Sequence, residues 1–234
     1  MIHKEASMRK VLSGLILLLM CQVPIFAQLD DKIADRLYES AKVFDELMNA
    51  PDGGPAKKVL KDAKCVAVIP AVKKAALGVG GQYGRGALTC KKDNGKGDWG
   101  PPSMIAISGG SFGLQLGGQS NDVIMLFMTP DSVQRLLKEK VTVGADMSAA
   151  AGPLGRQVSA ETSPTMRAEI LTYGRSRGVF AGISLKGAVL SPDKDANKSL
   201  YKKEVPAKDL LLTGSMPIPE PARKLIDALT AAAK

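Results

Sequence analysis

The chain has 234 residues, of which 45% are hydrophobic and 24% are charged, and this composition is sufficient for a folded core. The formal net charge is +9, which favours an anionic partner, either membrane headgroups or nucleic acid. After residue 27 no apolar stretch reaches the roughly 18 residues of a membrane-spanning helix. The composition therefore excludes a disordered chain and a polytopic membrane protein.

The first 27 residues have the pattern of a secretory signal peptide. A short basic start at Met8–Lys10 precedes an apolar run at Val11–Met20, and Pro24–Ala27 ends in a small residue. We predict cleavage after Ala27 and an exported protein that is periplasmic or outer-membrane-associated. Lipidation at Cys21 is the competing interpretation, although Met20 stands where such sites usually have a small residue. Export favours phospholipid over nucleic acid as the anionic partner.

Removal of that segment also removes His3, the only histidine of the chain. Ser111 lies in a G-x-S-x-G pattern, but no histidine remains to take the proton of its hydroxyl group. We therefore expect no enzymatic activity, no cofactor and no metal. Cys65 and Cys90 remain and either form a disulfide or stay as two buried thiols. Two cysteines alone cannot build a structural zinc site, which needs four ligands.

The residues after Ala27 are predicted to form one domain, 28–234, of the α+β class. We expect a glycine-rich, strongly twisted, mainly antiparallel sheet or barrel-like core, with an N-terminal amphipathic helix and short C-terminal helices. Apolar residues at three- and four-residue steps predict a first helix of about twenty residues that ends before Pro51. The predicted helices are 29–48, 55–61, 129–138, 196–201, 207–212 and 221–232, and the predicted strands are 65–69, 77–91, 103–107, 112–117, 122–128, 168–173 and 178–190.

Three details of this prediction can be tested. We expect Pro70 to end the strand that begins at Cys65. The strand at 122–128 is apolar on both faces and is therefore predicted to be central. The segment 141–156 is rich in small residues and is not assigned.

Glycines of one parity, Gly78, Gly80, Gly84 and Gly86, leave one face of the second predicted strand almost bare of side chains. Glycine weakens a strand unless a bend or a neighbouring backbone needs the space. We interpret the pattern as tight coiling of the sheet or close approach of another element.

A calcium loop is a weak alternative for the segment after Pro192. Asp193, Asp195 and Asn197 match the first ligand positions of an EF-hand, but Lys198 replaces the glycine that the loop needs. A solvated loop with a helix N-cap is the better interpretation.

Basic residues gather at predicted strand ends and turns, and Trp99 follows three of the lysines. A tryptophan flanked by lysines can rest at the headgroup level of a membrane, and its alternative is the core. The predicted lipid-binding set is Lys73, Lys74, Arg85, Lys91, Lys92, Lys96, Trp99, Arg156, Arg175, Arg177 and Lys186.

The chain from about Asp30 to Ala232 resembles the SYLF family, a lipid-binding module also found in endocytic adaptor proteins. Each segment is weak alone, but together and in this order the match is specific. The segments are 66–70 (VAVIP), 78–86 (GVGGQYGRG), 99–103 (WGPPS), 113–117 (GLQLG), 144–146 (GAD), 151–156 (AGPLGR) and 176–185 (SRGVFAGISL).

The resemblance implies binding of acidic phospholipids, phosphoinositides in eukaryotic relatives, without enzymatic activity. Together with the signal-peptide pattern, it leads us to expect a bacterial, exported member of the family that acts at an anionic membrane leaflet. Export makes actin an unlikely partner, and no protein partner is named. Lys186 departs from the pattern, since an acidic residue is expected there, and we expect no SH3 or FYVE companion domain. The alternative function is a protein-binding or structural module of the cell envelope.

Overall fold

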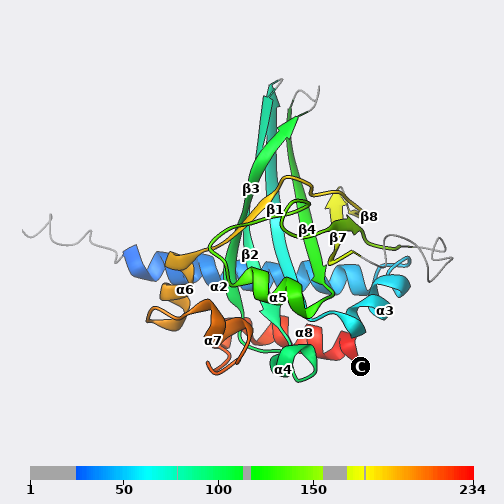
Figure 1. Ribbon diagram of the computed structural model, residues 1–234. Coiled ribbons are helices and arrows are strands. Elements are labelled where there is room, and N and C mark those ends of the chain that lie inside the picture. Colours follow the sequence, from blue (N-terminus) through cyan, green and yellow to red (C-terminus); the bar gives the residue numbers. More distant parts are fainter. Residues whose placement is uncertain (1–24, 78, 113–116, 155–167, 177) are drawn as a thin grey trace, which may run out of the picture.

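The computed structural model describes residues 25–77, 79–112, 117–154, 168–176 and 178–234, and it has the predicted α+β architecture. A long helix begins the described chain, a strongly curled sheet forms its centre, and short helices follow (Figure 1). The helices are α2 (Ile25–Met48), α3 (Gly54–Asp62), α4 (Lys92–Gly95), α5 (Pro130–Leu136), α6 (Lys194–Tyr201), α7 (Ala207–Leu211), the 3-10 helix η2 (Glu220–Ala222) and α8 (Arg223–Ala233).

The described residues contain nine strands, which form one sheet in the order β5-β9-β3-β2-β1-β4-β7-β6, with β8 paired to β7. Only the pairing of β6 with β7 is parallel among the described strands. The strands are β1 (Cys65–Leu77), β2 (Val79–Cys90), β3 (Ser103–Phe112), β4 (Gly117–Phe127), β5 (Val141–Thr142), β6 (Ala149–Ala151), β7 (Ile170–Ser176), β8 (Val179–Gly182) and β9 (Val189–Pro192).

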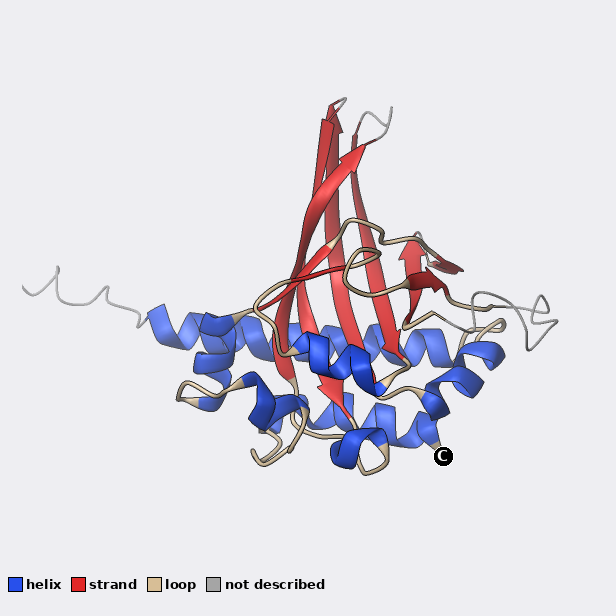
Figure 2. Cartoon of the chain, in the orientation of Figure 1, coloured by secondary structure: helices blue, strands red, loops and turns tan. Residues whose placement is uncertain are grey.

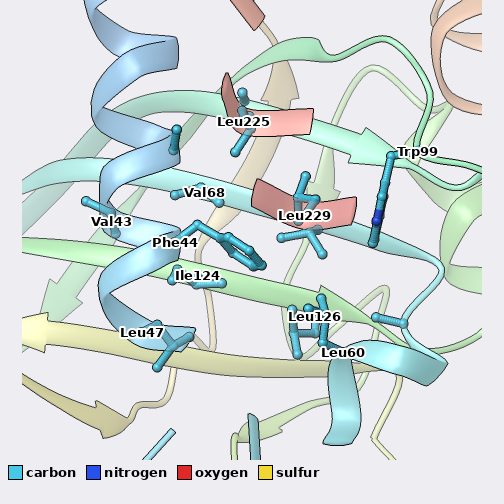
Figure 3. Packing of buried hydrophobic residues seen from close by; sticks show 14 of the residues in the cluster. Val43, Phe44, Leu47, Leu60, Val68, Trp99, Ile124, Leu126, Leu225 and Leu229 are labelled. Carbon is cyan, nitrogen blue, oxygen red and sulfur yellow. The ribbon is translucent and has the colours of Figure 1, made fainter. Parts of the chain in front are cut away.

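Helices cover the lower part of the sheet on both faces, and each face has its own hydrophobic cluster. On one face the apolar stripe of α2 packs against β1 and β4, with α3 and α8 completing the cluster (Figure 3). Phe44 and Leu47 are fully buried there. This stripe is the reason why α2 forms as predicted, since its polar residues face outward. On the other face α5, α7, β5 and β9 cover residues such as Ile105 and Phe127.

Pro70 does not end the first strand, so that prediction is wrong. At this position β1 shifts register against both of its neighbours, β2 and β4, and the strand continues to Leu77. Ala71 has a φ of 50° and donates its N–H to Asp122 Oδ1 at 2.9 Å. A bulge of this kind accommodates a proline, which has no N–H to give to a neighbouring strand.

The bulge also explains the glycines of β2. A Cβ at Gly86 would lie 2.1 Å from the carbonyl oxygen of Val68, and one at Gly84 would lie 2.8 Å from Cγ2 of Val72. Any larger residue would push the bulged strand away from β2. The close approach predicted for these glycines is therefore confirmed at these two positions.

Other boundaries differ from the prediction in an instructive way. Of the predicted strand 112–117, Phe112 is the last residue of β3 and Gly117 is the first of β4, while 113–116 lie outside the described residues. All but the last residue of the predicted strand 122–128 lie within β4, where Val123–Phe127 is buried between β1 and β7, as predicted for a central strand. The last predicted strand divides into β8 and β9, because β9 leaves the β7 hairpin and pairs with β3.

The four longest strands extend beyond the helices as a narrow projection (Figures 1 and 2). Their outer part is 73–77, 79–83, 108–112 and 117–120, and we call it the finger. The neighbouring strands end at its base. β9 pairs with β3 only as far as Ser108, and β7 pairs with β4 only as far as Asp122. The finger is thus a four-stranded sheet that projects from the body.

Candidate functional site: two cationic surfaces

The predicted lipid-binding residues separate into two groups at opposite ends of the sheet. Lys73 and Lys74 lie where β1 enters the finger, whereas Lys91, Lys92 and Lys96 surround α4. Cys90, the residue before Lys91, is opposite Cys65. Eight residue steps of β1 separate Cys65 from Lys73, so the two groups of lysines lie roughly 26 Å apart along the strand. The predicted set therefore cannot form one surface.

The α4 end carries a compact group of lysines, the basal lysine cluster, which we define as Lys61, Lys64, Lys91, Lys92 and Lys96. Lys91 Nζ donates to the carbonyl oxygen of Lys61 at 2.8 Å and lies 5.2 Å from the centroid of the Trp99 ring. Burial and then the charge of Lys64 lower the pKa of Lys91. Two of these ammonium groups have backbone partners, since Lys61 Nζ also donates to the carbonyl of Lys234 at 3.0 Å.

Trp99 itself is 4% exposed and belongs to the core cluster beneath α8 (Figure 3). Of its two interpretations, the core is the one that the structure has, so Trp99 is not a headgroup contact. The lysines that precede it in sequence misled the prediction, because nearby residues in irregular segments can point to solvent and core in turn. The ring instead gives Lys91 a cation–π contact.

The finger end carries a second group of cations on both faces of the sheet. Lys73 is exposed and opposite Tyr83, while Lys74 is half-buried and opposite Gln82. Successive residues of a strand point to opposite faces, so the two lysines lie on different sides of the finger. Lys186 is exposed, and its loop approaches β3. The carbonyl oxygen of the next residue, Gly187, would lie 3.2 Å from a Cβ at Gly109. We call Lys73, Lys74 and Lys186 the finger-base cations.

Lys186 lies near Lys74 across the width of the finger. Gly109 is opposite Gln82 in β3, and Gln82 is opposite Lys74 in β1. Two strand spacings, about 10 Å, therefore separate the Lys186 loop from Lys74. None of the finger-base cations has an ion pair within the described part of the chain.

Arg85 and Arg175 are engaged within the protein. Arg85 shares Asp193 with Arg36 of α2, each arginine at 3.5 Å, and its Nε donates to the Tyr83 hydroxyl. That hydrogen bond is the main cause that raises the pKa of Arg85. Asp193 also accepts from Ala196 N at 3.2 Å, which is the predicted N-cap of α6 rather than a calcium loop.

Arg175 holds β7 to β4. Its Nε and one terminal nitrogen both lie 2.6 Å from Asp122 Oδ2, and it also pairs with Glu46 of α2. Its guanidinium is 5.6 Å from the centroid of the Phe180 ring. Arg175 is therefore a structural residue whose charge is neutralised, and the prediction that it contacts headgroups is dropped. Arg156 and Arg177 lie outside the described residues.

The two remaining cysteines form a disulfide between Cys65 and Cys90, the first residue of β1 and the last of β2. The alternative of two free thiols is not what the structure has. Among the described residues, no three His, Cys, Asp or Glu gather as metal ligands would. Within that same part of the chain, no helix has the length and apolar character needed to span a bilayer.

A family model and several curated relatives match this chain. The Ysc84 model, described as "Las17-binding protein actin regulator", matches residues 108–232. SH3 domain-containing YSC84-like protein 1 is 33% identical over 197 residues in Rattus norvegicus, covering 82% of this chain and 57% of that protein. The Homo sapiens protein of the same name is 32% identical over 197 residues, covering 82% and 56%. LAS seventeen-binding protein 3 of Saccharomyces cerevisiae is 33% identical over 156 residues, covering 65% and 33%.

The chain thus spans just over half the length of the mammalian relatives and a third of the yeast relative.

Proposed function

This chain belongs to the Ysc84 family, whose domain is also called SYLF, and on that premise we propose that it binds anionic phospholipid membranes through the finger end without catalysing a reaction. The finger-base cations meet the headgroups, and the curled sheet serves as their rigid support. The body, with α2 and α8, faces away from the bilayer.

One observation carries this proposal: three lysines without ion-pair partners among the described residues surround the base of a projecting sheet. Each cation near an anionic surface contributes about 1 kcal/mol, and this attraction falls off within one Debye length. The finger projects from the side of the body opposite α4 and α8, so a membrane on that side meets the finger end before it meets those helices (Figure 1). The three lysines together support about 3 kcal/mol of attraction.

The basal lysine cluster is the weaker membrane-binding candidate. Two of its five ammonium groups already donate to carbonyl oxygens, and Asp62, Asp93 and Asp98 lie in the same segments. Acidic residues therefore accompany its lysines, whereas the finger has none. We assign this cluster no role in membrane binding, and it serves as a control of equal charge.

Vesicle co-sedimentation tests the proposal with a matched pair of triple variants. K73Q/K74Q/K186Q and K64Q/K92Q/K96Q each remove three positive charges, at the finger end and the α4 end respectively. We expect wild-type binding to rise with the phosphatidylglycerol fraction and to fall with salt. The finger-end variant should bind about a hundredfold more weakly, which corresponds to about 3 kcal/mol, while the α4-end variant stays close to wild type. Equal losses in both variants, or no binding at low salt, would contradict the proposal.

The cellular setting is part of the proposal. The signal-peptide pattern, residues 1–27, supports export in a bacterial cell and an envelope membrane as the target. Residues 1–24 lie outside the described residues, and cleavage after Ala27 would remove the first three residues of α2. N-terminal sequencing of the protein from a periplasmic fraction tests this point. A chain that begins at Gln28 is the expected result, and an intact N-terminus in the cytoplasm contradicts it.

A protein partner is the alternative function, and the family description favours it. That description names Las17 binding and actin regulation, so the expectation that actin is an unlikely partner rests on export alone and has no support from the relatives. If the alternative is right, a pull-down should recover one protein in a salt-insensitive way while vesicles recover none of the chain.

A further inference from the structure

The finger has a composition unlike the rest of the chain. Residues 75–84 and 99–121 contain no Asp, Glu, Lys or Arg, although 24% of the whole chain is charged. The helices and loops that cover the body are rich in charges, so an uncharged projection is not a general feature of this surface. Beyond Lys73 and Lys74 the finger carries no charged residue, and this part is complementary to a surface that would exclude charges.

The register of the strands orders the finger into rows. The Lys73–Tyr83 pair extends to Ser108 and Ser120, and Tyr83 is 47% exposed. Two steps further out, the row consists of alanine and glycine only. The outermost described pairs join Val79 to Leu77 and to Phe112. The finger therefore runs from lysine and tyrosine, through small residues, to three residues of apolar type.

From this order we propose that the finger penetrates one leaflet, so that its outermost row reaches the boundary between headgroups and acyl chains. The inference rests on the proposed membrane binding and adds the element that enters the bilayer. Lysine and tyrosine are the residues that settle at the headgroup level.

The dimensions of the finger fit this depth. Four residue steps separate Lys73 from Leu77, which is about 13 Å along the strand. Interfacial protein segments enter by about 5–10 Å, and the headgroup region on each side is about 5–8 Å thick. With Lys73 and Tyr83 at the outer headgroups, a finger tilted by roughly 50–65° from the membrane normal places the Leu77–Val79 pair at the acyl boundary.

The open edges of the finger set the limit of penetration. Among the described strands, residues 109–112 of β3 lack a partner on the side where β9 has ended, and residues 117–121 of β4 lack one where β7 has ended. Unpaired backbone N–H and C=O groups are strongly unfavourable in hydrocarbon but are satisfied among headgroups and water. The finger therefore stops at the interface and does not cross the membrane.

Tryptophan fluorescence distinguishes penetration from binding. The native Trp99 is buried at the opposite end of the sheet and serves as an internal reference. In F112W, a second tryptophan reports on the outer row. The probes are phosphatidylglycerol–phosphatidylcholine vesicles whose acyl chains carry bromine near the glycerol or near the methyl end. We expect the F112W emission to shift to the blue and to be quenched mainly by the shallow bromines, while wild-type emission stays unchanged.

A second variant separates the apolar contribution from the electrostatic one. V79Q/F112Q should sediment with vesicles like wild type at low salt, but should bind about tenfold more weakly at high salt, where charge attraction is screened. Circular dichroism and thermal unfolding check that the body is intact in both variants.

Each outcome has a distinct meaning. If F112W sediments with vesicles while its introduced tryptophan remains unquenched, penetration is overturned and membrane binding stays in place. Protein that does not sediment overturns both. A dimer in light scattering without lipid, formed by wild type and lost in V79Q/F112Q, assigns the finger to a second copy of this chain and overturns penetration as well.

Discussion

Asp122 joins three parts of the molecule, so its removal should destabilise the fold and not only the surface. Oδ1 accepts the Ala71 N–H of the β1 bulge, and Oδ2 accepts from Arg175 of β7. The side chains of Asp122 and Arg175 are 16% and 21% exposed, so this pair is partly desolvated. The bulge lies immediately before Lys73 and Lys74, and Asp122 therefore also fixes the position at which the finger leaves the body.

The magnitude follows from these contacts. A hydrogen bond to a charged group contributes about 1.5–3 kcal/mol, and the loss of one partner of a partly buried pair leaves the other uncompensated. We expect Asp122→Ala to lower the free energy of unfolding by about 3 kcal/mol, and Asp122→Asn by about 1–2 kcal/mol because its oxygen can still accept from Ala71. Arg175→Met should lower the free energy of unfolding by about 1–2 kcal/mol, since Asp122 still accepts the hydrogen bond from Ala71 of the bulge.

Urea unfolding of the two single variants and of D122A/R175M forms a double-mutant cycle. We expect a coupling energy of about 1–2 kcal/mol between the two residues. Folded R175M should bind vesicles like wild type, because its charge is already neutralised by Asp122 and Glu46. The structural role given to this pair is wrong if the free energy of unfolding of D122N lies within about 0.5 kcal/mol of wild type, or if R175M loses vesicle binding.

Three further predictions concern the body. The Cys65–Cys90 disulfide closes a loop of 25 residues, so C65A/C90A should lose about 3–4 kcal/mol of unfolding free energy and become insensitive to reductant, unlike wild type. Phe44→Ala, at a fully buried site, should cost about 3–5 kcal/mol in the same urea assay, and a loss below about 1 kcal/mol would contradict the packing against α8 and the sheet. Burial raises the pKa of Tyr173 above its ordinary value of 10, so the unfolded state loses this proton first and stability should fall above pH 10, by at most about 1.4 kcal/mol per pH unit. Tyr173→Phe should flatten that decline without loss at pH 7, because the buried hydroxyl has no hydrogen-bond partner among the described residues, and an unchanged slope would refute the assignment.

The sequence by itself determined those elements whose residue pattern reflects which of their faces are buried. The apolar stripe of α2, the buried run in β4 and the bare glycine face of β2 each reflect a local pattern that the packing then uses. Thr129 as the N-cap of α5, where its side chain accepts from Ser132 N, could likewise be predicted, because capping involves only neighbours in sequence.

The tertiary structure alone decided which cations are engaged within the protein. Arg85 and Arg175 look like Lys73 and Lys74 in sequence, but their carboxylate partners Asp193 and Asp122 lie far along the chain. Trp99 was ambiguous for the same reason, since a core is made by residues from distant segments. The separation of the lysines into two ends follows from strand register, and register depends on pairing between strands rather than on any one of them.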